Sequence, residues 1–398
     1  MFAIAALVVA LAGVAGTGVS SSFAETASTF PFTALQATTC PTASDCFVLG
    51  YTGGFGGARA PWILGSTNGG DTWHKMLTGF GVSGFGAYVW LNAFSCPSAS
   101  ECVAVGTTDG AAVAGGFSLI VTWHGGTTFT VWHGASRGAA LAAVSCANTS
   151  DCWAVGYAPS GAGVVLHTKN GGATWIHTGT PAGLRLLDGV SCPNATDCFA
   201  MGTLSKLPDA SLGSAPVLVA TRDGGATWRI EARPPTKVVA SLNGITCPSA
   251  LLCVAGGTGV VTFKDEKPTG NALGIVLTTA NGGRTWHLQT VQHAEKYDYR
   301  VVLSTASCVA SDKREHCWAV GFWGGINWGT SPTYPLIATS TNDGATWTEQ
   351  ELGKVLADAE DPMAGISCPT ATECVANAVR AVVRTTNGGA TWPRVWPS

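Results

Sequence analysis

Fourteen cysteines in seven close pairs are the residues of this chain whose type and spacing are most suited to chemistry. Paired thiols can form disulfides, hold zinc or carry out redox exchange. Structural zinc prefers two to four residues between paired ligands, and thioredoxin-like redox motifs use two. Six pairs here have five intervening residues, so the spacing favours local disulfides. The predicted bonds are Cys40–Cys46, Cys96–Cys102, Cys146–Cys152, Cys192–Cys198, Cys247–Cys253, Cys308–Cys317 and Cys368–Cys374.

A β-hairpin is the element that would hold each pair together. The turn Cys96-Pro97-Ser98-Ala99-Ser100-Glu101-Cys102 lies between two apolar segments, as in a hairpin. Residues that face each other across a hairpin have Cα atoms about 4.5–5.5 Å apart, within disulfide reach. Closing such a short loop is worth about 2–2.5 kcal/mol in the chain-entropy model. Seven disulfides place the protein in an oxidising compartment.

A second repeated stretch, Ser66-Thr67-Asn68-Gly69-Gly70-Asp71-Thr72-Trp73, returns along the whole chain. Its Asn or Asp is expected to bond the backbone two residues on, its second Gly to supply a positive φ, and its Trp to be buried. Copies begin at 66, 122, 168, 221, 279, 340 and 385, and the worn copy at 122 ends in Phe129. The key positions, to which we assign a structural role, are Asn68, Gly70, Trp73, Asn170, Gly172, Trp175, Asp223, Gly225, Trp228, Asn281, Gly283, Trp286, Asn342, Gly344, Trp347, Asn387, Gly389 and Trp392.

Each repeat has the same order of segments. A strand enters the cysteine turn, a strand such as Val103-Ala104-Val105-Gly106 leaves it, a variable loop follows, and a third strand runs into the Asn-Gly-Gly turn before a fourth begins at Thr-Trp. Seven such units predict an all-β, seven-bladed β-propeller of four-stranded antiparallel blades, with a local disulfide in the first hairpin of each blade. The predicted propeller spans residues 33–398.

The repeated Thr-x-Asn-Gly-Gly-x-Thr-Trp turn resembles the Asp-box, or bacterial neuraminidase, repeat. The complete unit looks most like the photosystem II stability/assembly factor type of propeller and its secreted bacterial relatives, over roughly residues 33–396. The resemblance implies the propeller fold. It does not fix a function, because such propellers include sialidases, other glycosidases, sorting receptors and non-catalytic factors. The cysteine pairs depart from the photosystem pattern.

The N-terminal residues read as an export signal. Residues 2–14 are apolar and would form the hydrophobic region of a signal peptide, with small residues before a cleavage site after Ala24. A positive charge near the start is missing, and an uncleaved membrane anchor is the alternative. The predicted divisions are residues 1–24 as signal or anchor and 25–32 as a short linker. The prediction is therefore a secreted or cell-surface protein.

Charge excludes one class of partner. Charged residues make up 11% of the chain and the net charge is −3, without the basic patch that nucleic acid requires. No membrane partner is expected unless the N-terminal segment is uncleaved. The eight histidines are scattered, so we predict no metal site and no cofactor. A monomer is expected.

Loop variability identifies one face of the predicted ring as the candidate binding surface. The cysteine turns and the Asn-Gly-Gly turns share one face and hardly vary, whereas the second-to-third loops and the blade connections share the other and vary widely. Aromatic side chains beside polar groups suit sugars or peptides. The alternative is that these charges are solvated loop tips and the aromatics pack the loops down. The candidate residues are Lys264, Asp265, Tyr297, Tyr299, Arg300, Trp323, Trp328 and Tyr334.

Two functions remain open. The first is non-catalytic binding of a protein or glycan through the variable loops, and the alternative is a glycoside hydrolase, sialidase-like or of another Asp-box type. Hydrolysis needs a placed pair of carboxylates, or a Tyr nucleophile with an acidic partner. The resemblance implies an arginine in a first-blade Phe-Arg-Ile-Pro-like segment, but residues 29–33 read Thr-Phe-Pro-Phe-Thr. Several acids only precede the second cysteine of a pair, and Asp109, Asp188, Asp209 and Asp361 belong to no motif. Binding is the preferred prediction.

Overall fold

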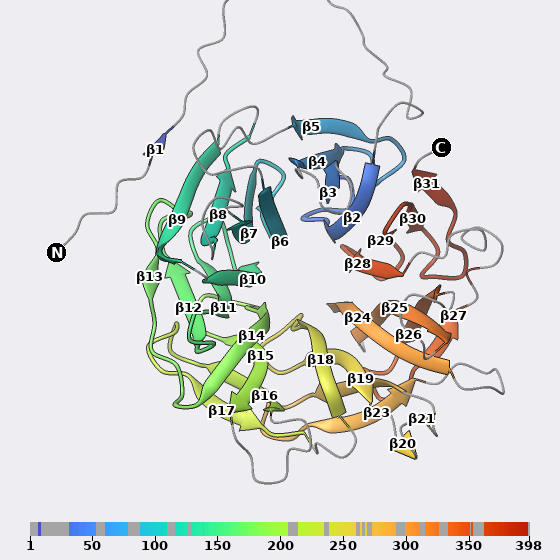
Figure 1. The fold of residues 1–398 in the computed structure, drawn as a ribbon. Helices are drawn as coiled ribbons and strands as arrows, with labels where there is room; N and C mark the ends of the chain where they lie inside the picture. The colour runs from blue at the N-terminus through green and yellow to red at the C-terminus, as the bar shows by residue number, and fades with distance from the viewer. Residues whose placement is uncertain are drawn as a thin grey trace, which may run out of the picture.

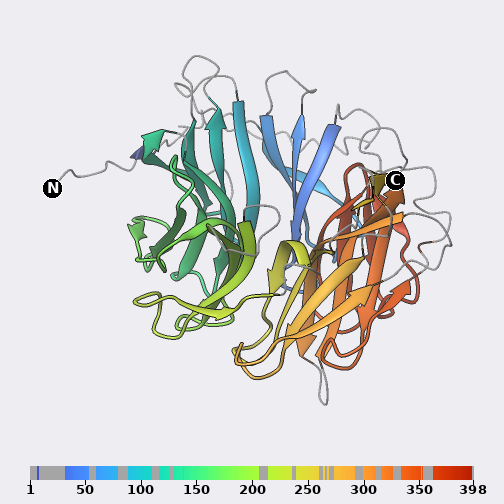
Figure 2. The ribbon, with the colours of Figure 1, turned by 60° about the horizontal axis from the view of Figure 1, so that its bottom comes forward.

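The seven repeats form seven blades around a central axis (Figure 1). The computed structural model describes residues 7–8, 32–52, 60–78, 88–109, 116–125, 129–137, 139–205, 214–234, 239–259, 263–264, 267–268, 273–291, 299–310, 315–325, 333–350, 352 and 362–396. Within these ranges every regular element is a strand. The innermost strand of each blade runs along the axis of the ring (Figure 2). The predicted fold class is confirmed.

Each blade is a four-stranded antiparallel sheet whose strands follow one another in sequence. Blade 1 contains β2 (Phe32–Thr39), β3 (Cys46–Thr52), β4 (Ala60–Ser66) and β5 (His74–Thr78); blade 2 contains β6 (Tyr88–Ser98), β7 (Glu101–Asp109), β8 (Phe117–Trp123) and β9 (Phe129–Arg137). Blade 3 contains β10 (Ala140–Cys146), β11 (Cys152–Tyr157), β12 (Gly163–Thr168) and β13 (Ile176–His177); blade 4 contains β14 (Leu184–Ser191), β15 (Cys198–Ser205), β16 (Ser214–Thr221) and β17 (Arg229–Ala232). Blade 5 contains β18 (Val239–Thr246), β19 (Cys253–Gly259), β22 (Gly274–Thr279) and β23 (His287–Val291). Blade 6 contains β24 (Tyr299–Ala310), β25 (Glu315–Gly325), β26 (Thr333–Ser340) and β27 (Thr348–Gln350); blade 7 contains β28 (Met363–Ser367), β29 (Cys374–Ala378), β30 (Val382–Thr385) and β31 (Arg394–Trp396).

Three short strands lie outside this pattern. The pair β20 (Phe263–Lys264) and β21 (Lys267–Pro268) forms a two-stranded sheet. The strand β1 (Leu7–Val8) adds a fifth strand to blade 2, with Leu7 opposite Val131 of β9. Otherwise the predicted signal segment, residues 1–24, and most of the 25–32 linker lie outside the described residues, so their assignment stays a prediction.

All seven predicted disulfides are present. Their Cα atoms lie 4.0–4.1 Å apart, and no cysteine is free. Cys146 faces Cys152 directly in the β10–β11 register, and Cys308 faces Cys317 in the β24–β25 register. The widened Cys308 pair therefore keeps the same geometry, because its extra residues lengthen the hairpin beyond the bond.

The Asn-Gly-Gly stretch forms the same hydrogen-bonded turn in six blades. In blade 1 the buried Ser66 hydroxyl accepts from the Gly70 amide at 2.8 Å and donates to Asn68 Oδ1 at 2.9 Å. That same Asn68 oxygen accepts from the Thr72 amide at 2.9 Å, so it closes a loop four residues long. The expected bond two residues on is not the one formed. The Trp also lies just before the fourth strand, which in this blade begins at His74.

The second Gly of each turn packs against the preceding blade. Gly225 has φ +85°, and a Cβ there would lie 3.1 Å from the Trp153 indole nitrogen of blade 3. Gly389 has φ +94°, and its Cβ would lie 3.2 Å from that of Trp318 in blade 6. Glycine is therefore required here by both backbone conformation and contact between blades.

Apolar clusters between neighbouring blades form the core. One cluster joins Phe47 and Leu49 of blade 1 to Leu91 and Phe94 of blade 2, and the same pattern recurs around the ring. A hydroxyl ladder lies beside these clusters, in which the Ser before the first cysteine of one blade accepts the amide of the first cysteine of the next. The pairs in the described residues are Ser95 with Cys146 (3.1 Å), Ser145 with Cys192 (3.0 Å), Ser191 with Cys247 (2.9 Å), Ser307 with Cys368 (3.0 Å) and Ser367 with Cys40 (2.9 Å).

Contacts between blades 7 and 1 close the ring, a point the sequence leaves open. The Thr38 hydroxyl donates to Asn377 Oδ1 at 2.7 Å, and Arg384 pairs with Asp71. The last pair of the hydroxyl ladder crosses the same junction. Each of these blades takes its four strands from one end of the chain. Side-chain bonds, packing and the bond from the Leu35 amide to the Val379 carbonyl at 2.7 Å therefore join them without exchange of a strand.

Candidate functional site

On one face of the propeller, the Asn-Gly-Gly turns are hydrogen-bonded to the cysteine turns. The Gly171 amide of the blade 3 turn donates to Ser150 of that blade's cysteine turn at 3.0 Å, and blades 1, 4, 5 and 7 have the equivalent bond. The two repeated turns therefore lie on one face, as predicted, and are bonded to each other. We call this the repeat face. The opposite face, formed by the second-to-third loops and the blade connections, is called the variable face.

Two of the predicted binding residues stack on the variable face of blade 6. Trp323, near the end of β25, and Tyr334, near the start of β26, face each other in register, with ring centroids 4.4 Å apart and planes 24° apart. Both are half-buried, and Trp323 also packs on the core cluster that contains Val301 and Leu303. The stack thus has a packing role as well as an accessible part.

Two further predicted residues begin the neighbouring strand. Tyr299 and Arg300 start β24 and face Gly325 and Gly324 of β25. The Arg300 guanidinium lies over the Phe322 ring, 5.8 Å from its centroid, and partial burial lowers its pKa. Tyr299, Arg300, Trp323 and Tyr334 are therefore brought together by β24, β25 and β26.

Of the other four predicted residues, the structure describes only Lys264. Lys264 lies on β20, opposite Lys267 of β21. Asp265, Tyr297 and Trp328 lie outside the described residues. Their place in a binding site stays a prediction.

A channel of about 260 Å³ follows the axis and is lined by all seven innermost strands. Each of these strands has a β-bulge at the same level. The residues at this level are Gln36, Asn92, Ala142, Asp188, Asn243, Ser304 and Ala364. In blade 4 the irregular segment spans residues 186–188 and ends at Asp188. Bulges re-aim a side chain, and here they turn one residue per blade toward the channel.

Several of these ring residues bond the next blade. Asn92 Nδ2 donates to the Leu141 carbonyl at 2.7 Å, and Asn243 Nδ2 donates to that of Leu303 at 2.8 Å. The Ser304 hydroxyl donates to the Met363 carbonyl at 2.9 Å. In each case the acceptor immediately precedes the bulge of the following blade.

Asp188 is the one charged residue among the described residues that line the channel. Its side chain is exposed to channel water, and partial desolvation by the surrounding blades raises its pKa to about 6. A carboxylate has no proton to donate, so Asp188 cannot make the bond that Asn243 makes. It belongs to no motif in the sequence, and the structure places it on the axis.

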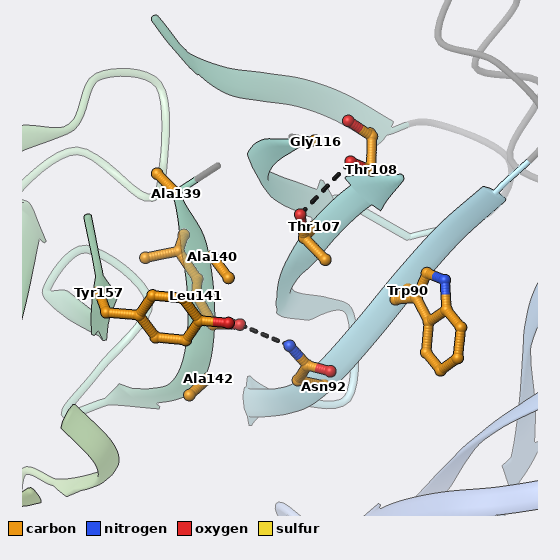
Figure 3. Close-up of a pocket in the computed structure, with 10 residues that line it drawn as sticks. All are labelled: Trp90, Asn92, Thr107, Thr108, Gly116, Ala139, Ala140, Leu141, Ala142 and Tyr157. Atoms are coloured by element: carbon orange, nitrogen blue, oxygen red, sulfur yellow. Dashed lines mark hydrogen bonds between the residues drawn. The ribbon is translucent and has the colours of Figure 1, made fainter. Parts of the chain in front are cut away.

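A second cavity, of about 360 Å³, opens on the variable face between blades 2 and 3 (Figure 3). Trp90 of β6 and Tyr157 of β11 lie at opposite ends, and Asn92 lies between them. Thr107 and Thr108 of β7 form a further wall, and the rest is Gly, Ala and Leu. This cavity was missed by the sequence analysis. A signal existed, because the position two residues before the bulge is aromatic in blade 2 alone. The other blades have Ala34, Ala140, Leu186, Ser241, Val302 and Pro362 there.

Metal and membrane features are not found in the described part of the chain. No group of three or more His, Cys, Asp or Glu side chains there is placed to hold a metal ion. No helix among the same residues is long and apolar enough to cross a membrane.

Solved propellers are similar to this chain in fold at low identity. The β-propeller domain of the Trilobed protease from Pyrococcus furiosus, which has an open velcro topology, aligns with a TM-score of 0.50 and 6% identity over 92% of this chain and 98% of that one. The structure of YCF48 bound to D1 peptide aligns with a TM-score of 0.39 and 14% identity, over 92% of this chain and 82% of that one. Trypanosoma rangeli sialidase aligns with a TM-score of 0.43 and 11% identity, over 79% of this chain and 53% of that one. The chain matches no known family model, and no curated protein matches it in sequence.

Proposed function

We propose that this chain is a secreted or cell-surface propeller that binds a protein or glycan through its variable face and catalyses no reaction. One observation carries the proposal. The variable face holds a ligand-sized cavity and a stacked aromatic pair, whereas the turns of the repeat face use their polar groups to bond one another. Ligand sites are concave and combine aromatic walls with a few polar groups, which is the composition of the variable face.

Disulfides support export. Seven bonds in seven hairpins persist only where thiols are not kept reduced, as outside the cell or in the periplasm. The apolar residues at the N-terminus have the composition of a signal segment. The disulfides and the N-terminal segment both support export from the cytoplasm.

A binding screen tests the proposal. The wild type, Trp323→Ala and Leu251→Ala are compared on a glycan array and in pull-downs from secreted and envelope fractions. Leu251 is 59% exposed in a cysteine turn, so its variant removes an apolar side chain from the repeat face as a control. We expect a bound partner that the control retains. Binding that the repeat-face variant abolishes and Trp323→Ala leaves intact would contradict the proposal.

Glycoside hydrolysis, the alternative, is tested with a panel of aryl glycosides. Hydrolysis requires acid and base or nucleophile carboxyl groups at the reacting bond. Chromophore release that disappears in Asp188→Asn would replace the binding proposal with a hydrolase whose site is the axial channel. We expect no release above that of buffer.

A further inference from the structure

We infer that the cavity between blades 2 and 3 binds one pyranose ring of a neutral saccharide, with Trp90 as its stacking platform and Asn92 as its polar anchor. The inference rests on the proposed binding function and narrows it to one site and one class of ligand. Its site shares Asn92 and Ala142 with the wall of the axial channel and is separate from the aromatic stack of blade 6.

The size and charge of the cavity define the class of ligand. Its volume of about 360 Å³ lies at the lower end of the range for small-molecule sites. Its described lining residues are Trp90, Asn92, Thr107, Thr108, Gly116, Ala139, Ala140, Leu141, Ala142 and Tyr157, all of them uncharged. An ionised ligand would lose hydration here without gaining a partner of opposite charge, so a neutral ligand is favoured.

Aromatic groups at the two ends suit a ring with apolar faces. Trp90 is half-buried, and its position in the strand register, opposite Thr107, puts it at the mouth of the cavity on blade 2. Tyr157 is half-buried on blade 3, opposite Ala140. The C–H faces of a pyranose pack well on such surfaces, because an aromatic ring gives a large contact area at little entropic cost.

Polar groups between them suit hydroxyls. Asn92 Nδ2 is held by the Leu141 carbonyl, which fixes the amide orientation and leaves Oδ1 turned toward Trp90 (Figure 3). The Thr107 hydroxyl donates to the Phe117 carbonyl at 3.1 Å, so its lone pairs remain as acceptors. Within the described chain the Tyr157 hydroxyl has no protein partner, so it can both donate and accept. Mixed donors and acceptors match saccharide hydroxyls, each of which does both.

Tyr157 also separates this cavity from a smaller one. The second cavity, of about 70 Å³, shares Ala139, Ala140, Leu141 and Tyr157 and extends toward Trp132. Removing the whole Tyr157 ring would join the two spaces and change the shape of both. Tyr157→Phe is therefore the cleaner variant, since it deletes only the hydroxyl.

Affinity measurements with defined probes test the site. Titration calorimetry and saturation-transfer NMR of the full chain use cellotetraose, maltotetraose and chitotetraose, with sialyllactose as the charged comparison. We expect binding of at least one neutral probe and none of sialyllactose. Trp90→Ala should weaken binding about tenfold or more, and Tyr157→Phe by about three- to tenfold. Trp90→Phe, which keeps an aromatic face, should recover most of the loss and so distinguishes stacking from misfolding.

The outcomes separate the inference from the proposed function. Leu251→Ala on the repeat face is the control variant and should bind the neutral probe as the wild type does. A neutral probe whose affinity falls in Trp323→Ala but not in Trp90→Ala overturns the inference and keeps a binding propeller. Capture of a protein by the variable face with no saccharide bound has the same consequence. Failure of every probe and partner to bind the variable face overturns both.

Discussion

Replacing Asp188 with Asn should stabilise the propeller and remove a pH dependence. Asp188 occupies the bulge position of blade 4, where Asn92 and Asn243 each bond a carbonyl of the next blade. The equivalent acceptor for Asp188 is the carbonyl of Leu242, which precedes the blade 5 bulge. An ionised carboxylate cannot donate to it, whereas an Asn side chain can.

The pKa sets the sign and the size of the effect. Desolvation raises the pKa of Asp188 from 3.8 to about 6, so the folded state binds this proton more tightly than the unfolded state. Stability therefore falls as pH rises from about 4 to about 6 and is then constant. A pKa difference of about two corresponds to a loss of at most about 3 kcal/mol in the free energy of unfolding. Because channel water reaches the side chain, we expect a loss of about 1 kcal/mol. The new hydrogen bond should add about 0.5–1.5 kcal/mol.

Urea unfolding at about pH 4.5 and about pH 7.5 measures both contributions, since this interval contains most of the titration. The wild type should be less stable at the higher pH, and Asp188→Asn should be the more stable protein there, by about 1–2 kcal/mol. Asn243→Asp is the matched reverse variant. It deletes the donor to Leu303 and adds a carboxylate to the same ring, so it should lose stability as pH rises.

Equal stability of the wild type and Asp188→Asn at both pH values would refute this reasoning. It would mean that the channel hydrates the carboxylate as well as bulk water does. A variant that is stabilised equally at both pH values would instead support the hydrogen bond and refute the desolvation of Asp188. The two contributions can thus be tested separately in one experiment.

Three further predictions concern the repeated scaffold. Replacing Cys146 and Cys152 with Ser should lower the free energy of unfolding by about 2–2.5 kcal/mol, measured in urea, while a thiol titration of the denatured, unreduced wild type finds no free thiol. Thr221→Val leaves the buried amide of its turn without an acceptor and should cost about 1–3 kcal/mol in the same assay. Ser367→Ala and Ser145→Ala remove equivalent bonds at the closing junction and at an internal junction; hydrogen exchange should rise more in the first, because no chain connection crosses that junction. Equal exchange would show that closure is as stable as the internal junctions.

The fold was predictable because the repeat carries its own turns. The cysteine spacing predicted a hairpin between the first and second strands of each blade. The position of the Asn-Gly-Gly stretch predicted the turn between the third and fourth strands. The bond pattern inside that turn was not predictable, since Asn68 can accept from more than one amide and only the buried Ser66 hydroxyl selects Thr72. Ring closure also escaped prediction, because Asn377 and Thr38 meet across more than 300 residues, as their sequence separation of 339 shows.

Site prediction succeeded where the strand register decides proximity. Trp323 and Tyr334 flank a loop on paired strands, so their meeting follows from the hairpin. The cavity between blades 2 and 3 could not be found in this way, since Trp90 and Tyr157 belong to different blades. Their distance depends on how far adjacent sheets are splayed, which is set by side-chain packing across the junction and is not encoded in local spacing.

Comparison of equivalent positions would have found both functional candidates. Where every blade needs the same residue, as at the second Gly of each turn, packing against the preceding blade explains the choice. Trp90 is aromatic where the other blades, counted two residues before the bulge, have Ala34, Ala140, Leu186, Ser241, Val302 and Pro362. Asp188 stands where the others have Asn, Gln, Ser or Ala. Asp188 gives up a bond between blades and carries a desolvation cost, and Trp90 leaves part of a large apolar ring accessible. In this propeller those two residues lie at the axial channel and at the lateral cavity, so these are the two places where a ligand should be sought.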